Sequence, residues 1–562
     1  MAGELWRLDG TTLAALIRAG KVSAREAVTA HLERLHAVNP RINAVVWTLD
    51  EQALAEADAA DRALRAGEPL GSLHGLPVTT KVNSDQAGLP TDNGVEKYRD
   101  LIAAEDSPQI GSLRRAGAIV VGRTNTPAFS MRGQTENRLH GRTLNPWNPA
   151  VTCGGSSGGA GASLAAGIGV IAQGNDIAGS IRWPAYCNGV VGLRPSPGRV
   201  AAYNGTSTAA RRMSSQLMLV NGPLARSVRD ARLALAAMAV RDVRDPLWTP
   251  APLVGEAVPR PIGAALVTEV EGVRLDPAVI AAVRTAGAAL ALAGYRVEEV
   301  NPPRLSHVTE LWHPIGLSDL NISLRPLLAD AGDPGIQRFI DAWWDLKGGA
   351  DLPTYLGALA ERDTILREWG VFMETYPVIV MPSSTEVAVP VNADVEDEAG
   401  AARMLGAVRF QLVLPVLGLP GLAVPTAPAN GLPMGVQIVS RRYREDLCLD
   451  AGEVVEAHAD LHPDRPPINA SRLPASDCEL HGGLRHDASV AGRPLLLVIV
   501  VEGDRVVQGG RRQVRIRGED VPRRVTGPEL VDDERDADPR PGDAGRAARD
   551  ARRARDVRVL GP

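Results

Sequence analysis

The sequence predicts an α/β protein in which helices cover both faces of a large sheet. Two observations support this class. Short apolar segments that are typical of strands alternate along much of the chain with longer segments of helical periodicity. Hydrophobic residues make up 44% of the 562 residues, so the chain is long and apolar enough for two or three ordinary domains.

The first elements are predicted to be two helices, after which strands and helices alternate. Ser23 is a suitable N-cap, and Glu26 completes the pattern of a capping box. The apolar segment around Val78 predicts a strand that places Lys81 near its C-terminal end. The expected helices span 11–19, 23–37, 51–66 and 107–116, and the expected strands span 43–47, 76–82 and 118–122.

The alternation continues toward the C-terminus. Residues 145–159 form a loop by composition, because Asn, Pro, Gly and Ser dominate them. Residues 301–375 are predicted to be mainly helical, and their large aromatic side chains belong either to the core or to an acyl or leaving-group pocket. The other expected helices span 158–167 and 277–293, and the other expected strands span 169–174, 261–267, 295–300, 378–382 and 435–439.

The composition of the chain changes near Pro466 and Pro467. We expect one domain over 1–470, within which 301–375 is a helical insertion that lines part of a pocket. Residues 471–562 contain many arginines interspersed with Asp, together with Pro and Gly. Their low hydrophobicity and dense charge predict a poorly ordered appendage, for which a coding sequence read out of its ancestral frame is an alternative origin.

Charge and composition narrow the range of partners and compartments. A formal net charge of −5 favours neither nucleic acid nor an anionic membrane as a partner. No apolar run approaches the ~20 residues of a membrane span, and no signal peptide is expected at the N-terminus. The four cysteines lack the spacing of a disulfide framework or a zinc site, which favours reduced thiols and a cytoplasmic location.

Three short stretches that lie far apart hold the residue types of one catalytic site. They are Thr80–Asn83, Cys153–Gly159 and Gly174–Arg182. Lys81 offers a base, Ser156 a relay and Ser180 a nucleophile, which are groups that acyl transfer requires. Lys81 must be uncharged to act as a base, and burial at the end of an apolar strand would lower its pKa from about 10.4.

Small residues around Ser156 and Ser180 permit unusual backbone conformations. Paired glycines flank Ser156 on one side and Ser157 on the other, and glycine adopts conformations that side chains forbid. The turn before Ser180 can direct several backbone N–H groups at one point, which is the arrangement of an oxyanion hole. We expect its donors at Ile177, Ala178 and Gly179.

The order and the gaps of these stretches closely resemble the amidase signature family of serine hydrolases. Lys81 precedes Ser156 by 75 positions, and Ser156 precedes Ser180 by 24. The similarity runs from about residue 5 to about residue 467. Further family-like segments are Leu73–Val78, Gly122–Pro127, Gly141–Thr143, Gly222–Val228 and Gly431–Gln437.

This resemblance implies a fold and a set of supporting residues. The fold is a large central mixed sheet covered by helices, with the Gly/Ser stretch in its centre and a cis peptide before Ser156. By motif match, Ser157, Asp176 and Arg182 support the triad, and Ser130 and Met131 fall in the acyl-site loop. Three positions depart from the family pattern: Val82 replaces Asp, Asn175 replaces Ser, and Ala178 replaces Gly.

The function that follows is hydrolysis of a carboxamide C–N bond through an acyl-enzyme on Ser180. Ser156 and Lys81 relay its proton, and no metal or organic cofactor is expected. The expected substrate is a small-molecule amide or carbamate, and the chemistry also suits aryl amides and esters. We expect a monomer or a homodimer, with no nucleic-acid or membrane partner.

Three other interpretations use the same residues. Gly154–Gly158 matches the GxSxG pattern of other serine hydrolases, but a loop rather than a strand precedes it, and no Asp/His pair with a matching context follows. An inactive amidase-fold scaffold is disfavoured because Lys81, Ser156 and Ser180 are all present. A glutamine amidotransferase-type subunit would need partner subunits, and residues 84–90 do not resemble that branch.

Overall fold

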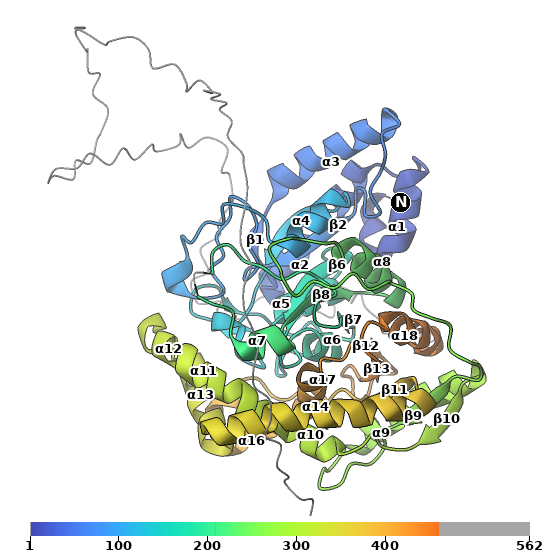
Figure 1. Ribbon diagram of the computed structural model, residues 1–562. Coiled ribbons are helices and arrows are strands. Elements are labelled where there is room, and N and C mark those ends of the chain that lie inside the picture. Colours follow the sequence, from blue (N-terminus) through green and yellow to red (C-terminus); the bar gives the residue numbers. More distant parts are fainter. Residues whose placement is uncertain (1, 208, 460–562) are drawn as a thin grey trace, which may run out of the picture. The chain divides into compact units, whose positions relative to one another are not determined.

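One mixed sheet of eleven strands crosses the part of the chain that the computed structural model describes, residues 2–207 and 209–459 (Figure 1). The strands are β1 (Val45–Thr48), β2 (Pro77–Lys81), β3 (Ile119–Thr124), β6 (Ile171–Asp176), β7 (Val191–Arg194), β8 (Val220–Ala225), β9 (Gly263–Leu266), β10 (Arg296–Glu299), β11 (Val378–Pro382), β12 (Gly421–Pro425) and β13 (Gly435–Val439). Their spatial order is β1-β3-β2-β6-β8-β7-β12-β13-β11-β9-β10. The short strands β4 (Glu136–Asn137) and β5 (Gly141–Arg142) form a separate hairpin.

The pairing in the sheet is both parallel and antiparallel. β2 lies parallel between β3 and β6, with Lys81 opposite Thr124 and Val78 opposite Ile171. β6 pairs antiparallel with β8 on its other side. Because β2 and β6 are parallel neighbours, the residues that follow them emerge at the same edge of the sheet. The predicted α/β class with a large mixed sheet is therefore confirmed.

Helices surround this sheet. They are α1 (Gly10–Arg18), α2 (Ala24–Ile42), α3 (Asp50–Arg65), α4 (Pro108–Arg115), α5 (Gly158–Ala165), α6 (Arg182–Asn188), α7 (Met213–Met218), α8 (Val228–Met238), α9 (Pro277–Leu292), α10 (Leu305–Trp312), α11 (Ser318–Ser323), α12 (Arg325–Ala331), α13 (Pro334–Lys347), α14 (Leu352–Thr375), α15 (Ala393–Glu396), α16 (Glu398–Ala407), α17 (Arg409–Leu417) and α18 (Glu445–Ala459). Shorter segments are η1 (Ala2–Arg7), η2 (Glu96–Tyr98), η3 (Ala128–Ser130) and the π-helical η4 (His313–Leu317).

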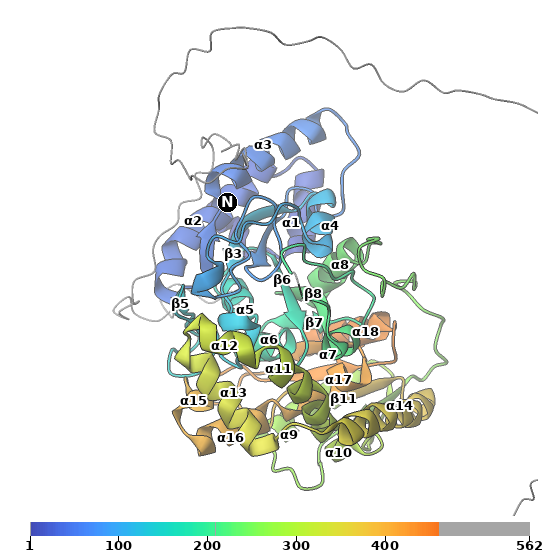
Figure 2. The same cartoon turned by 60° about the vertical axis from the view of Figure 1, so that its left-hand side comes forward.

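Both faces of the sheet are covered. Successive side chains of a strand point to opposite faces, so neighbouring residues should enter different core clusters. On β12, Leu422 and Val424 join the cluster that holds residues of α8, α9 and α18, whereas Ala423 joins the cluster that holds residues of α5. Figure 1 places α1–α4 near β1 and β2, and Figure 2 places them near β3; both views place α10, α14 and α16 toward the other end of the sheet.

The elements predicted by residue range all have counterparts. Lys81 is the last residue of β2, as predicted. The capping box of α2 is formed, because Ser23 and Glu26 each accept a hydrogen bond from the backbone of the other. α2 extends past its predicted end to Ile42, and Pro40 lies within its last turn without ending the helix.

Three central strands escaped prediction. β7, β8 and β12 contain Gly or Pro, which weaken the alternation of apolar residues by which strands are identified. β8, for example, holds the run Asn221, Gly222 and Pro223 but is fully buried in the sheet. These three strands are positioned by pairing with one another and with strands from distant parts of the chain.

The helical segment predicted over 301–375 is present as α10–α14. Trp312, Trp343 and Trp369 are exposed by only 1%, 5% and 0%, so these aromatic residues belong to the core. Within residues 2–207 and 209–459, no single helix could span a membrane, although the bent pair α16 and α17 passes a length and composition test together. The predicted domain boundary at 470 and the appendage 471–562 lie outside the described residues and stay predictions.

Candidate active site

Three neighbouring parts of the fold bring Lys81, Ser156 and Ser180 together. Lys81 ends β2, Ser156 lies in the loop before α5, and Ser180 lies in the turn between β6 and α6. The backbone N–H of Ser157 donates to the carbonyl of Ser180 at 3.2 Å, which joins the second stretch to the third. The three stretches that the sequence singles out are therefore adjacent in space.

The amine of Lys81 touches three acceptor oxygens. Its Nζ lies 2.7 Å from Ser156 Oγ, 3.2 Å from Ser157 Oγ and 3.0 Å from Asn175 Oδ1. A neutral amine has two N–H donors and one lone pair. An ammonium group could donate to all three oxygens. A neutral amine could instead donate to Ser157 and Asn175 and accept the proton of Ser156 with its lone pair, so the contacts are compatible with either state.

The surroundings of Lys81 favour this neutral state. Its side chain is fully buried, and burial lowers the pKa of Lys81 well below its usual value because it disfavours the ammonium form. The negative charge of Asp176 works in the opposite direction but is the smaller effect. The side chains in direct contact with the amine are uncharged, which explains why desolvation prevails.

The Gly/Ser stretch is buried and tightly enclosed. The Gly155–Ser156 peptide is cis, as the resemblance implied. A Cβ on Gly155 would lie 2.2 Å from the carbonyl oxygen of Arg132, so only glycine fits at this position. Ser156 and Ser157 are almost fully buried, whereas Ser180 is partly exposed. The nucleophile candidate is thus the most exposed of the three serines.

Asp176 organises the turn that carries Ser180. Its carboxylate accepts from Gly179 N at 2.9 Å, from Arg182 Nε at 3.0 Å and from Arg194 Nη1 at 3.2 Å. Burial by itself would raise the pKa of Asp176, but the two guanidinium groups outweigh it and hold the pKa at about 2. Arg182 also donates to the carbonyl of Gln411, which anchors the turn to α17.

The backbone N–H groups of the turn differ in their availability. Within the described residues, the N–H groups of Ile177, Ala178 and Ser180 make no hydrogen bond, so they are open to an oxyanion. The N–H of Gly179, which was also expected as a donor, is bonded to Asp176. Gly179 has a φ of +104°, which lets the chain turn sharply here.

Ser130 and Met131 lie beside this site on a separate loop. Ser130 Oγ accepts from Asn83 Nδ2 at 2.9 Å and donates to Asn93 Oδ1 at 2.7 Å. Asn83 Oδ1 in turn accepts from Asn175 Nδ2 at 3.0 Å. A chain of neutral amides therefore runs from Lys81 to the loop, while Met131 is half-buried against the aromatic core.

Sequence reasoning missed three of these contact residues. In the sequence, Asn175 stands out only as a departure from the family pattern, and Asn83 only as a neighbour of Lys81. Both lie within the three stretches, so their polar side chains were an available signal. Arg194 had no such signal, because the pairing of β7 with β8 and β12 brings it to Asp176.

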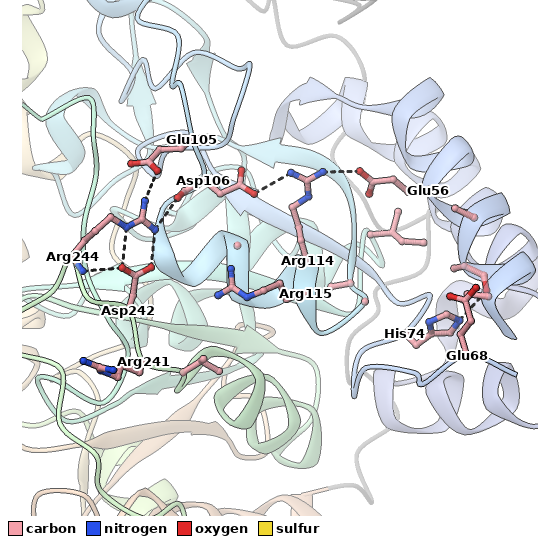
Figure 3. Close-up of a pocket in the computed structure, with 18 of the residues that line it drawn as sticks. Glu56, Glu68, His74, Glu105, Asp106, Arg114, Arg115, Arg241, Asp242 and Arg244 are labelled. Atoms are coloured by element: carbon pink, nitrogen blue, oxygen red, sulfur yellow. Dashed lines mark hydrogen bonds and ion pairs between the residues drawn. The ribbon is translucent and has the colours of Figure 1, made fainter. Parts of the chain in front are cut away.

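A large surface groove lies elsewhere. It has a volume of about 1290 Å³ and lies between α3, α4 and residues 240–244 (Figure 3). Several of its charged side chains pair with one another: Arg114 pairs with Glu56 and Asp106, and Arg244 pairs with Asp242 and Glu105. None of the predicted site residues lines it, so we assign it no catalytic part.

Comparison with known proteins identifies the family of this chain. The amidase family profile matches residues 26–449. The chain belongs to the amidase family. An indoleacetamide hydrolase of Bradyrhizobium diazoefficiens is 47% identical over 466 residues, which cover 82% of this amidase and 88% of the relative. A glutamyl-tRNA(Gln) amidotransferase subunit of Salinispora arenicola is 31% identical, over 83% of this chain and 99% of that one.

Solved structures agree at the level of the fold. The structure of a fatty acid amide hydrolase superposes with a TM-score of 0.72 at 24% identity, over 82% of this chain and 86% of that chain. Family membership and sequence similarity together establish the amidase as a hydrolase that acts on the carbon–nitrogen bonds of linear amides.

Proposed function

We propose that this amidase hydrolyses the C–N bond of a small carboxamide through an acyl-enzyme on Ser180. Ser156 relays the proton, and Lys81 is the base. The observation that carries the proposal is the 2.7 Å contact of the fully buried Lys81 Nζ with Ser156 Oγ, next to the hydrogen bond that ties Ser157 to Ser180. No metal or organic cofactor enters the proposed steps.

The reaction proceeds in two halves. Neutral Lys81 takes the proton of Ser156, Ser156 takes the proton of Ser180, and the Ser180 oxygen attacks the carbonyl carbon. Free N–H groups of the turn, at Ile177 and Ala178, stabilise the oxyanion. The N–H of Gly179 donates to Asp176, so it contributes to the oxyanion hole only if it forms a second, bifurcated hydrogen bond to the oxyanion. The relay returns the proton to the leaving nitrogen as the C–N bond breaks, and water then repeats the path to release the acid.

The other site residues have supporting roles in this proposal. Asp176 and Arg182 hold the turn, and Ser157 accepts a hydrogen bond from Lys81. Ser130 and Met131 border the acyl group. Their loop is connected to the proposed base because Asn83, which donates to Ser130, accepts from Asn175, and Asn175 accepts from Lys81. The segment 301–375 helps to shape the substrate site where Ile177 and Ala178 pack against its aromatic core, which Trp369 joins at a separate point through Pro303.

For the substrate, we propose the primary amide of an arylacetic acid. The 47% identity to an indoleacetamide hydrolase supports this class over a glutamine-dependent role, whose relative is 31% identical. Carbamates and activated esters are accepted as slower or incidental substrates, since the same acyl-enzyme chemistry suits them. A cytoplasmic location and a monomer or homodimer stay predictions from the sequence.

The test combines a substrate panel with two variants. Indole-3-acetamide, phenylacetamide, a short aliphatic amide, an aryl carbamate, glutamine and an activated ester are assayed with the wild-type protein. We expect the highest kcat/KM for an arylacetamide. Ser180→Ala should lower kcat by at least about 10⁴-fold, and an active-site serine probe should label Ser180 by mass spectrometry.

Lys81→Ala provides the second arm. It should slow amides more than activated esters, because only the amine leaving group needs the returned proton. Substantial turnover by Ser180→Ala would end the assignment of the nucleophile. Preference for glutamine would instead favour the amidotransferase-type role.

A further inference from the structure

The aromatic core of the helical segment makes one direct hydrogen bond to the catalytic turn. Trp312, the last residue of α10, donates from Nε1 to the carbonyl oxygen of Ile177 at 3.0 Å. The two residues are 135 positions apart in the chain. The bond therefore joins the segment 301–375 to the residues that precede Ser180.

The geometry of a peptide bond gives this contact a consequence. The Ile177–Ala178 peptide is trans, and in a trans peptide the C=O and the following N–H point to opposite sides. Holding the carbonyl of Ile177 on the side of Trp312 therefore aims the N–H of Ala178 away from the aromatic core. Within the described residues that N–H has no partner, as expected of a donor kept for a ligand.

The indole that holds the carbonyl is itself immobilised. Trp312 is 1% exposed and stacks on Trp343, with ring centroids 4.8 Å apart and an angle of 13° between the planes. A Cβ on Gly316 would lie 2.7 Å from the Trp312 ring, so the π-helical turn packs tightly against the indole. The indole N–H of Trp312 is therefore held in a fixed position beside the carbonyl of Ile177.

We propose that Trp312 is a positioning residue for the oxyanion hole. By fixing the Ile177–Ala178 peptide plane, it holds the N–H of Ala178 ready for the negative charge that develops on the substrate carbonyl oxygen. This inference rests on the proposed function, because it supposes that Ser180 forms an acyl-enzyme. In this proposal the segment 301–375 contributes to catalysis through Trp312, without touching the substrate.

The test removes the indole N–H and keeps the ring. Trp312→Phe should lower kcat by about 10- to 100-fold, which is less than the 10²–10³-fold loss on deleting a donor, and should leave KM within about twofold. Trp369→Phe is the matched control, because its indole N–H donates to the carbonyl of Pro303 at 2.8 Å in the same core and not to the turn. The control should lose stability but not kcat.

A second variant guards against misfolding. Benzothienylalanine at position 312 replaces N–H by sulfur with little change of shape. Infrared spectra of a carbon-13-labelled carbamoyl-enzyme should show its carbonyl stretch at higher frequency in either Trp312 variant. A folded Trp312 variant with unchanged kcat and an unchanged carbonyl frequency would overturn the inference. Activity that survives in Ser180→Ala would instead remove the proposed function beneath it.

Discussion

At the scale of single residues, the chemistry depends on what surrounds the Lys81 amine. Its three contacts are all neutral, namely two serine hydroxyls and the amide oxygen of Asn175. An ammonium group without a contacting carboxylate is costly in a buried site, so burial lowers the pKa of Lys81 and favours its neutral form. Asn175 thus supplies a hydrogen-bond acceptor without supplying a charge.

Asn175→Asp tests this account through the pH profile. A carboxylate 3.0 Å from Nζ favours the ammonium form and should raise the pKa of Lys81. Because the base works only when it is deprotonated, the acid limb of kcat/KM should move to higher pH by about one to three units. The measurement is kcat/KM against pH for one good amide substrate.

Asn93→Asp is the control for that experiment. It places the same charge at the far end of the amide chain, where Asn93 contacts Ser130 and not Lys81. Its acid limb should move less than that of Asn175→Asp. An identical shift in both variants, or no shift in Asn175→Asp, would contradict the role given to the neutral environment of Lys81.

At the scale of elements, the strand β6, the turn that carries Ser180 and the helix α6 are joined into one hydrogen-bonded unit. β6 ends at Asp176, whose carboxylate binds the turn N–H of Gly179 and the first residue of α6, Arg182. Asp176 and Arg182 are both fully buried. These hydrogen bonds fix the backbone between Asp176 and Arg182, and they thereby fix the position of Ser180.

Gly179→Ala should break this unit. The residue has a φ of +104°, and an added Cβ would lie 2.4 Å from Gln411 Cβ, so the turn must shift. We expect kcat/KM to fall by at least about tenfold, with a loss of about 1–3 kcal/mol in the free energy of unfolding. Steady-state kinetics and urea denaturation measure the two effects.

Gly272→Ala is the comparison at the same scale. Its φ is +71°, and nothing lies within 4 Å of the added methyl group. It should cost about 1–2 kcal/mol of stability and leave kcat/KM unchanged. Full activity of Gly179→Ala at reduced stability would show that the turn tolerates the shift, against our account.

At the scale of the whole molecule, the sheet makes the site possible. β2 and β6 are neighbours in the sheet, although their residues are about 90 positions apart. Later strands and helices then close around them, since Gln437 of β13 accepts from Arg182 and α17 supplies Gln411. The site therefore needs nearly the whole chain up to Ala459.

Truncation after Pro467 tests where the necessary part ends. The last described helix, α18, packs against β12 and α8, and the family match ends at 449. The shortened protein should keep its melting temperature and its kcat/KM within about twofold. Truncation after Arg444, which removes α18 and the Glu445–Arg199 ion pair, should give insoluble or unfolded protein. Loss of activity on truncation after Pro467 would contradict the predicted boundary at 470.

The sequence by itself determined the α/β class, the two strands that carry the site, and the three stretches whose residues meet there. These features are local: apolar spacing identifies β2 and β6, and small residues identify the turn. Only the tertiary structure decided that Asn175 contacts Lys81, that Arg194 reaches Asp176, and that Trp312 holds Ile177. Each of these contacts joins residues distant in the chain, and only long-range strand and helix packing specifies them.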